Sequence, residues 1–453
     1  MSCHEYDCGP VPLARLDLRG VPAAQIAAKV ARPASMRGLP TEEVRSILEE
    51  VRTDGDIALR RLTERFDGVV LDSLRVPREE LEQARAVVAP QLREALEVAY
   101  GRILAYHSQE SRPEEDFEMD GVRVRRLVRP VVRAGLYAPG GRARYPSTVL
   151  MCAAPARVAG VEELALCVPP GPDGAVATET LAAAAIAGID EVYQIGGAQA
   201  IGALAFGTQT VRPVDVIVGP GNRFVAEAKR QVSGLVGVPS AFAGPSEVVV
   251  VADATVPAKW VAVDVLVQAE HGPDGLAWLV TWSEEVAENV LGEIERLVTS
   301  SPRRSELIST LDSGGSLVLV DGPAEAISLA NAVAPEHLEL LVQGAEALVD
   351  LVRSAGAVFC GAYSPASIGD YLAGPNHVLP TARSARFSSA LRVDDFRTHI
   401  HAVSVERDGL LHLAPYVEAI AEAEGLAAHA LSVRLRAEGA DGEDSAVEAT
   451  DTR

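Results

Sequence analysis

The chain has 453 residues, of which 48% are hydrophobic and only 4% aromatic, and it carries a formal net charge of −22. This length favours about two to four domains, and the aliphatic composition is typical of layered α/β proteins. No run of about 18 apolar residues is available for a membrane span. The acidic charge argues against a nucleic-acid partner, because phosphates need clustered Lys and Arg.

The N-terminal segment and the cysteines indicate a cytoplasmic protein. Met1–Arg19 lacks the apolar stretch of a secretory signal. The five cysteines are an odd number and do not have the spacing of a metal site. Cys152, Cys167 and Cys360 lie among apolar residues, so we expect reduced thiols in the core.

The first 110 residues predict packing elements without recognisable chemistry. Leu13–Gly20 alternates apolar and polar residues, as in a short edge strand or arm. Thr41–Phe66 is amphipathic, and Thr41 is a suitable N-cap for a helix. Arg78–Ser108 is a second amphipathic helical region, interrupted by Pro90.

From Pro130 onward, short apolar strands alternate with helical segments. In the first run, Val131–Gly141 predicts a strand that runs into a glycine turn. Further strands are predicted over Glu163–Val168, Glu191–Ile195 and Val214–Val218, with helices over Ser147–Val158 and Glu179–Ala187. This alternation indicates βαβ units and a mostly parallel sheet. Ligands of such sheets bind outside the carboxyl ends of the strands. Tyr137, Gln199 and Asn222 lie in or beside the glycine-rich turns at those ends.

These turns do not form a standard dinucleotide fingerprint. Gly219–Phe224 begins like G-x-G-x-x-G but lacks the last glycine. The chain also contains no P-loop, no C-x-x-C and no G-x-S-x-G motif. Taken by themselves, the turns are therefore compatible with ordinary βα connections.

A second run of strands follows the loop-like residues Gly237–Gly244. Its predicted strands are Glu247–Ala252, Leu276–Thr281, Leu317–Asp321 and Ala357–Cys360. Because the alternation restarts, the sequence predicts two α/β units side by side. Pro415–Leu435 is mostly helical, with Pro415 suited to the first turn. Ala437–Arg453 is acidic and poor in large apolar residues, which predicts a disordered tail.

Val267–Asp274 contains the first candidate ligands. Gln268 and His271 are three residues apart, which places both side chains on one face of a helix. The apolar spacing before them predicts such a helix, and Gly272-Pro273 ends it. An amide oxygen and an imidazole nitrogen can meet one metal ion there. The alternative is a structural histidine near a helix end.

Ala334–Leu340 contains a candidate acid–base pair. Pro335 can begin a helix, which would leave Glu336 and His337 at its electropositive N-terminus. An imidazole takes and returns protons near neutral pH, and a carboxylate can activate water. The alternative is a solvated helix start in which Glu336 complements the dipole.

The last predicted strand is followed by a polar, glycine-rich loop over residues 369–377. Asp370 is a candidate oxygen ligand, and His377 can bind a metal or a substrate carboxylate. A solvated surface loop is the alternative. Together with Gln268, His271 and one further histidine, Asp370 would form an N/O site with open positions. Such a site suits zinc and is poor for iron–sulfur clusters or calcium.

Together these blocks resemble the L-histidinol dehydrogenase family. They occur in the family's order from Arg133 to Arg436, over roughly two thirds of the chain. The matching blocks are Gly-Leu-Tyr-Ala-Pro-Gly-Gly, Gly-Gly-Ala-Gln-Ala-Ile, Gly-Pro-Gly-Asn, Ala-Gly-Pro-Ser-Glu, Gln-Ala-Glu-His-Gly-Pro-Asp, Pro-Glu-His-Leu, Gly-Asp-Tyr, Asn-His-Val-Leu-Pro-Thr and Ala-Ala-His.

The resemblance implies a cytoplasmic enzyme of histidine biosynthesis that oxidises L-histidinol through L-histidinaldehyde to L-histidine and reduces two NAD. It also implies one zinc ion per subunit, with the ligands Gln268, His271, Asp370 and His429. In the family the last of these ligands comes from the partner subunit, so a homodimer is implied. The alternative within the family is a paralogue that oxidises another small polar alcohol to its acid.

The resemblance also assigns roles to single residues. Glu336 and His337 match the catalytic pair, and Tyr137, Gln199 and Asn222 match the cofactor contacts. The implied substrate contacts are Ser246, Gln268, His271, His337, Asp370, Tyr371, His377, Glu424 and His429. An idle zinc-binding protein of the same fold would not need the intact pair, and a zinc hydrolase would leave the glycine turns without a purpose.

The predicted fold class is α/β, with two side-by-side, incomplete Rossmann-like parallel-sheet units, a small N-terminal arm and a C-terminal helical segment. The predicted domains are an arm (1–30), a zinc and catalytic α/β domain (31–135 with 245–385), an NAD-binding α/β domain (136–244), a helical segment that contributes to the partner's site (386–436) and an acidic tail (437–453). Pro239-Ser240 and Arg223 depart from the family's usual residues near the proposed mouth of the site, so we expect altered affinity.

Overall fold

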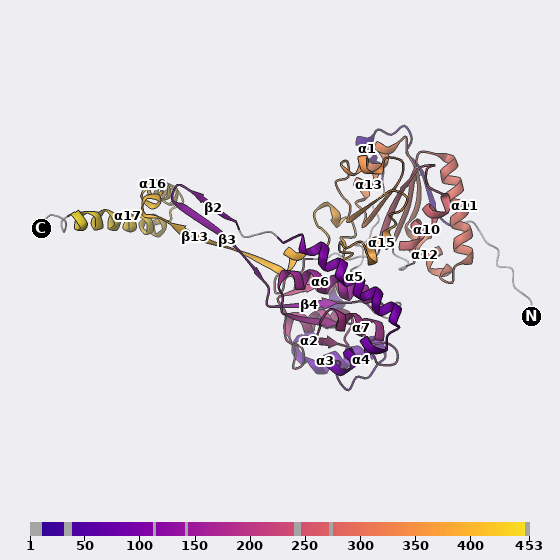
Figure 1. The fold of residues 1–453 in the computed structure, drawn as a ribbon, viewed down its shortest axis with the longest axis horizontal. Helices are drawn as coiled ribbons and strands as arrows, with labels where there is room; N and C mark the ends of the chain where they lie inside the picture. The colour runs from indigo at the N-terminus through magenta and orange to yellow at the C-terminus, as the bar shows by residue number, and fades with distance from the viewer. Residues whose placement is uncertain are drawn as a thin grey trace, which may run out of the picture. The chain divides into compact units, whose positions relative to one another are not determined.

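The computed structural model describes residues 11–30, 39–111, 115–140, 144–239, 246–270 and 275–448. It divides into two compact units, one formed by residues 1–111 with 131–396 and the other by residues 112–130 with 397–453. Within the described residues, the strands form a six-stranded and a four-stranded sheet in the first unit and a three-stranded sheet in the second (Figure 1). No helix in this part of the chain is both long and apolar enough to span a membrane.

The six-stranded sheet is parallel and has the order β1-β10-β9-β8-β11-β12. Its strands are β1 (Ala14–Asp17), β8 (Glu247–Ala252), β9 (Leu276–Thr281), β10 (Gly315–Leu319), β11 (His337–Leu341) and β12 (Ala357–Cys360). Strands β8, β9 and β11 are buried at every residue, because helices cover both faces of the sheet.

The helices of this sheet pack into two apolar clusters, one on each face. One cluster includes residues of α10 (Ala258–Ala269), α11 (Glu284–Ser300) and α12 (Arg304–Gly314). The other includes residues of α1 (Ala23–Lys29), α13 (Pro323–Val333) and α14 (Ala345–Val349). The short helix α15 (Ala366–Tyr371) follows β12.

The four-stranded sheet is also parallel, with the order β6-β5-β4-β7. Its strands are β4 (Arg133–Tyr137), β5 (Glu163–Cys167), β6 (Glu191–Tyr193) and β7 (Val216–Val218). One apolar cluster joins the sheet to α4 (Arg78–Val87), α5 (Pro90–Ser108), α6 (Pro146–Ala159) and α7 (Thr178–Ile186). The other joins it to α2 (Thr41–Asp54), α3 (Asp56–Asp67), α8 (Gly197–Phe206) and α9 (Arg223–Val232).

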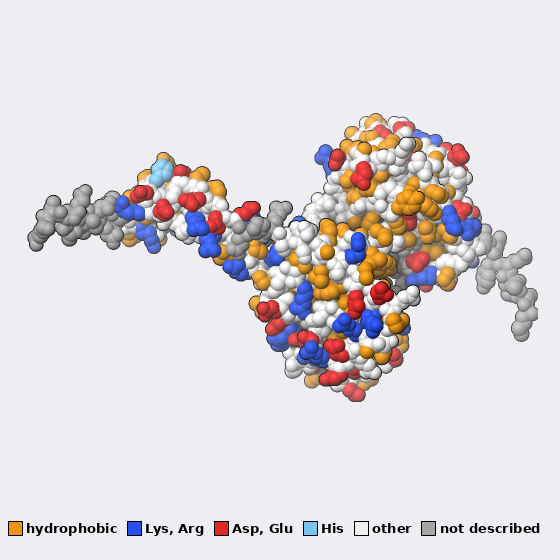
Figure 2. Space-filling view, viewed as in Figure 1, with side chains coloured by type: hydrophobic (Ala, Val, Ile, Leu, Met, Phe, Trp, Pro, Cys, Tyr) orange, Lys and Arg blue, Asp and Glu red, His pale blue; other side chains and the backbone are white. Residues whose placement is uncertain are grey.

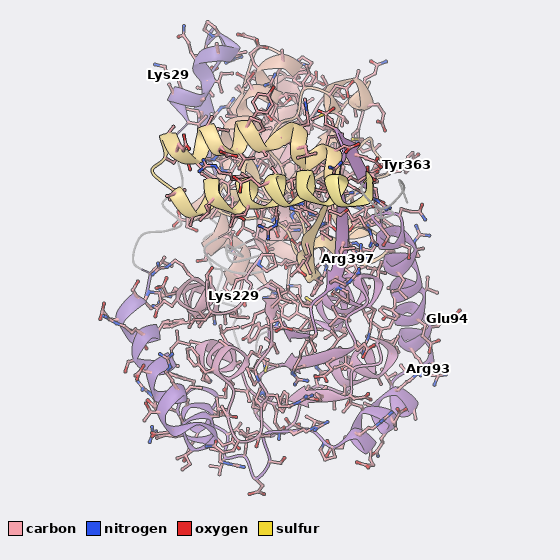
Figure 3. All side chains as sticks on the ribbon, turned by 90° about the vertical axis from the view of Figure 1, so that its left-hand side faces the viewer. Lys29, Arg93, Glu94, Lys229, Tyr363 and Arg397 are labelled. Atoms are coloured by element: carbon pink, nitrogen blue, oxygen red, sulfur yellow. The ribbon has the colours of Figure 1, made fainter. Side chains whose placement is uncertain are left out.

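The second unit combines an antiparallel sheet with a helical hairpin. The sheet consists of β2 (Asp116–Met119), β3 (Val122–Pro130) and β13 (Arg397–Val405), and the hairpin of α16 (Arg407–Ala423) and α17 (Ala427–Glu448). Figure 3 shows the two helices side by side and antiparallel. The Arg434 guanidinium joins them by donating to Glu418 at 2.7 Å and to Glu422 at 3.0 Å.

The surface carries both signs of charge. Figure 2 shows Lys and Arg side chains interspersed with Asp and Glu on the visible face of each unit. The net charge of −22 is therefore not gathered into one acidic area on that face. Cys152 and Cys167 are free thiols buried in the apolar clusters of the four-stranded sheet, as predicted.

The structure confirms the predicted fold class of two incomplete Rossmann-like sheets with an N-terminal arm and a C-terminal helical segment. It changes the assignment of the N-terminal helices. Residues 41–108 pack on the four-stranded sheet, whereas the sequence grouped 31–135 with 245–385. The pattern of an amphipathic helix indicates that one face is buried, but it does not indicate which sheet that face packs against. The sequence therefore assigned these helices to the wrong sheet.

Three local predictions also need correction. The helix predicted over Thr41–Phe66 is broken at Gly55, whose φ of 56° is open to glycine but costly for other residues. Pro415 lies inside α16 rather than in its first turn. Helix α17 continues to Glu448 through most of the predicted disordered tail, in keeping with the helix propensity of its Ala and Glu residues. Residues 449–453 lie outside the described part.

Candidate active site

Glu336 and His337 lie at the amino end of strand β11, directly after helix α13. The helix ends at Val333, Ala334 adopts a φ of 52°, and His337 is the first residue of the strand. The predicted helix start at Pro335 is therefore wrong. A residue that precedes proline disfavours the α conformation, so Ala334-Pro335 ends one helix instead of beginning another. The pair consequently lies near a helix C-terminus.

The backbone of Glu247, the first residue of β8, holds both members of this pair. Its N–H donates to Glu336 Oε2 at 3.0 Å, and its carbonyl oxygen lies 3.1 Å from His337 Nδ1. A carbonyl can only accept, so Nδ1 must carry the proton of this bond. His337 Nε2 faces Asp370 Oδ1 at 3.3 Å. Glu336 and His337 are 8% and 3% exposed, so their orientation is held within the protein.

Burial and mutual proximity shift the pKa values of these groups. Burial raises the pKa of Glu336 to about 7, although His337 and the N–H of Glu247 act in the opposite direction. For His337, burial lowers the pKa, but the carboxylates of Glu336 and Asp370 outweigh it and bring the value to about 9. Burial and the neighbouring Glu336 raise the pKa of the Glu247 carboxyl to about 8. The cluster can therefore exchange protons near neutral pH.

Asp370 and His377 are joined through the backbone. His377 Nδ1 lies 2.7 Å from the carbonyl oxygen of Asp370, and its Nε2 lies 3.3 Å from the hydroxyl of Thr148 on α6. The sequence predicted a loop over residues 369–377, but its first residues are helical: Asp370 and Tyr371 are the last two residues of α15. The side chain of Tyr371 is exposed. His377 thus connects the segment after α15 to helix α6, which packs on the four-stranded sheet.

Gln268 lies in the last turn of α10, as the sequence predicts, and is only 2% exposed. Helix α10 is in contact with α15, which carries Asp370. An amide oxygen is a ligand that a metal ion accepts, so a metal ion at this position suits the buried Gln268 side chain. His271, the second predicted ligand on this segment, lies outside the described residues.

The remaining candidates around the six-stranded sheet and in the second unit are less enclosed. Ser246 is half-buried directly before β8, and its carbonyl accepts the N–H of Leu276 at 3.0 Å. Glu424 and His429 are exposed in the second unit, where Glu424 follows α16 and His429 lies in the first turn of α17. In the described part of the first unit, the predicted zinc ligands are Gln268 and Asp370.

The four-stranded sheet places its candidates at the carboxyl ends of its strands. Tyr137 ends β4, and its hydroxyl accepts the N–H of Gly197 at the start of α8, at 3.1 Å. Gln199, in the first turn of α8, is 1% exposed, and its Nε2 has no partner in the described part of the chain. Asn222 caps α9 by accepting from the N–H groups of Phe224 and Val225 at 3.0 and 3.1 Å.

The turn before α9 is held closely against β4. Gly219 has a φ of 109°, and a Cβ there would collide with the carbonyl oxygen of Tyr137, so only glycine fits. The side chain of Lys229, which is labelled in Figure 3, is 1% exposed and donates to the carbonyl of Gly219. This geometry leaves the N-termini of α8 and α9 beside a buried, unpaired amide donor, and that combination fits an anionic dinucleotide.

Comparison with known proteins decides the family. The chain matches the family model described as histidinol dehydrogenase over residues 31–437. The chain belongs to the histidinol dehydrogenase family. It is 49% identical to the histidinol dehydrogenase of Parasynechococcus marenigrum (strain WH8102), over 86% of this chain and 89% of that protein. The corresponding protein of Gluconobacter oxydans (strain 621H) is 46% identical over 88% and 93% of the two chains.

A solved structure supports the same assignment. The crystal structure of histidinol dehydrogenase from Elizabethkingia anophelis matches with a TM-score of 0.89 and 35% identity, and the match covers 95% of this chain and 99% of that one. This member of the histidinol dehydrogenase family is therefore an enzyme of the dehydrogenase class.

Sequence reasoning missed several residues that hold the site of this family member together. Glu247 and Glu339 are buried carboxyls near the pair, Asp264 is a buried carboxyl beside Glu339, and Thr148 contacts His377. The only signal in the sequence was an acidic residue within an otherwise apolar segment, such as Glu339 within His337–Leu341. An acidic residue among core positions is the kind of exception that identifies a functional or positioning group.

Proposed function

We propose that this member of the family oxidises L-histidinol through L-histidinaldehyde to L-histidine, with two NAD reduced per substrate and one zinc ion per subunit. The observation that carries the proposal is the buried pair Glu336 and His337, fixed by the backbone of Glu247 and facing Asp370. The relatives named above give no support to a paralogue that acts on another alcohol.

Zinc, when bound, would anchor the imidazole and amine of the substrate, and NAD would accept the hydride. The residues that we expect to hold zinc are Gln268, His271, Asp370 and His429 of the partner subunit, so the proposal includes a homodimer. The buried amide of Gln268 and the carboxylate of Asp370 have the donor chemistry that zinc accepts.

The protein's own groups then move the protons. His337 Nδ1 is committed to the carbonyl of Glu247, so in the neutral imidazole Nε2 is the atom that takes the proton of the substrate hydroxyl in the first oxidation. The aldehyde stays bound, and Glu336 takes a proton from the water that attacks it. A pKa of about 7 lets Glu336 act as a base near neutral pH. His337 serves again as the base in the second oxidation.

The other expected contacts position the two small molecules. Ser246, Tyr371, His377 and Glu424 would bind polar groups of the substrate. On the cofactor side, Tyr137 and Asn222 would shape the turns at α8 and α9, and the free Nε2 of Gln199 would donate to the dinucleotide. Fixed donors of this kind hold the two reactants in one orientation, which lowers the entropic part of the barrier.

The test counts NADH formed per L-histidinol consumed, followed by near-ultraviolet absorbance. We expect two NADH per substrate, loss of turnover after chelation and recovery with zinc. An amino alcohol that lacks the imidazole, such as L-alaninol, is the matched substrate control and should give little NADH. A zinc-loaded dimer that leaves L-histidinol unoxidised, or that yields one NADH per substrate, would contradict the proposal.

A further inference from the structure

A pair of buried carboxyl groups lies beneath the candidate active site. Asp264 on α10 is 7% exposed, Glu339 on β11 is fully buried, and their carboxyl groups lie within reach of a hydrogen bond to each other. Glu339 Oε1 also accepts the backbone N–H of Ala366, the first residue of α15, at 3.1 Å. The three elements α10, β11 and α15 are thus connected through two side chains.

A hydrogen bond between two carboxyl groups requires a proton on one of them, because an ionised carboxylate can only accept. In agreement with this, no N–H or O–H of the other described residues reaches the second oxygen of Glu339, although that oxygen is buried. Burial raises the pKa of both groups, to about 6 for Asp264. One shared proton satisfies both side chains and leaves a single buried negative charge, near His337.

Asp264 and Glu339 are close in sequence to residues of the candidate active site on the same helix or strand. Asp264 is one helical turn before Gln268, so both side chains lie on one face of α10. Glu339 is two residues after His337, so both point to the same face of β11. Ala366 is four residues before Asp370 on α15. The carboxyl pair therefore connects the three elements that carry the proposed zinc ligand Gln268, the proposed base His337 and the proposed zinc ligand Asp370.

We propose that Asp264 and Glu339 are positioning residues that share one proton and hold α10, β11 and α15 in the arrangement that lets Gln268, His337 and Asp370 act on one metal-bound substrate. This inference rests on the proposed function. Apolar residues of similar size often stabilise a core as well as a buried polar pair does. The benefit of the pair is therefore the fixed orientation of three elements rather than stability, as for groups that orient metal ligands from behind.

The test compares two variants of Glu339 in the full-length dimer. Glu339→Gln keeps an acceptor for the N–H of Ala366 and offers an N–H to Asp264, so it reproduces the protonated form. Glu339→Leu has a similar volume but makes neither bond. Glu295→Gln, an exposed change on α11, is the control. Zinc dissociation constants from competition with a chromophoric chelator, thermal midpoints, and kcat and KM for L-histidinol are measured for each.

We expect Glu339→Gln to stay within about threefold of the wild type in zinc affinity and kcat. Glu339→Leu should lose about 10–100-fold in zinc affinity, the range known for residues that orient ligands, and should lose kcat more than KM. A purely structural role would instead lower the thermal midpoint of Glu339→Leu and leave its zinc affinity unchanged, which would overturn the proposal. Wild-type turnover tests the proposed function separately, because the zinc comparison does not depend on the substrate.

The shared proton has a readout that needs neither zinc nor turnover. At neutral pH, the infrared difference spectrum between the wild type and Glu339→Gln should contain the carbonyl band of a protonated carboxyl, and so should that of Asp264→Asn. If both difference spectra contain only bands of ionised carboxylates, the pair does not share a proton and the proposal fails, even if Glu339→Leu does not fold.

Discussion

The two parallel sheets of the first unit present their candidate residues at opposite edges. In the four-stranded sheet, Tyr137 ends a strand and Asn222 caps the N-terminus of a helix, so helix N-termini line this edge. In the six-stranded sheet, Glu247 and His337 begin strands, and Gln268 lies where a helix ends. Helix N-termini favour anions and helix C-termini favour cations. The edges therefore suit the two groups that we propose, a dinucleotide and a zinc ion.

The two amino edges differ as well. In the four-stranded sheet this edge is closed by an ion network, in which Arg133, only 4% exposed, donates to Glu163 at 3.1 Å and to Glu191 at 2.5 Å. At the six-stranded sheet, the carboxylates of Glu247 and Glu336 form no ion pair with a Lys or Arg of the described residues. Charges paired with Arg keep ordinary ionisation, whereas buried acids with raised pKa values are typical of chemistry.

The largest effect that we expect tests the six-stranded edge. Replacing His337 by Ala should lower kcat by ~10²–10⁴-fold, the usual contribution of a general acid–base group, with little change in NAD affinity. The exposed His399→Ala on β13 is the control. Steady-state NADH formation measures both variants. If His337→Ala turned over at the wild-type rate, His337 would have no role in the mechanism. The assignment of the chemistry to the six-stranded sheet and of NAD binding to the four-stranded sheet would then fail.

A smaller effect should appear at the four-stranded edge. Gln199→Leu removes the buried, unpaired donor and should raise the KM for NAD by about tenfold, the cost of one lost hydrogen bond of roughly 1.4 kcal/mol. Zinc content should stay unchanged. Gln343→Leu, an exposed change beside the six-stranded sheet, should alter neither quantity. A loss of zinc from Gln199→Leu with unchanged NAD affinity would contradict the assignment of the edges.

The smallest effects concern stability, with opposite signs of pH dependence. The folded-state pKa of Glu247 is raised from 4.5 to about 8, so its contribution to stability is complete below pH 4.5 and is lost as the pH rises toward 8. For Glu191, burial raises the pKa, but Arg133 and other partners outweigh it and lower the value to about 2. Its contribution is present above pH 4.5 and is lost as the pH falls toward 2.

Urea unfolding of the metal-free protein at a series of pH values tests this contrast. Glu247→Gln should flatten the decline in the free energy of unfolding between about pH 5 and 8, and Glu191→Gln the decline on the acid side, each by on the order of 1–2 kcal/mol. If both variants change the same side of the pH profile, the electrostatic difference between the two amino edges is refuted.

The sequence alone determined the parts of this protein that depend on local pattern. The alternation of apolar strands and helices predicts two parallel sheets, and the glycine turns locate Tyr137, Gln199 and Asn222 at strand ends. The motif blocks predict the family, which the comparisons confirm. These features can be predicted from the sequence because periodicity, turn chemistry and contiguous motifs involve residues that are close together in the chain.

Only the tertiary structure decided how distant segments meet. It shows that His337 begins a strand, that residues 41–108 cover the four-stranded sheet, and that Glu247 fixes the pair from 89 and 90 residues away. Asp264 and Glu339 were not recognisable as a pair for the same reason. A shifted pKa or a shared proton depends on burial and on a neighbour within hydrogen-bond distance, and neither is encoded in local pattern.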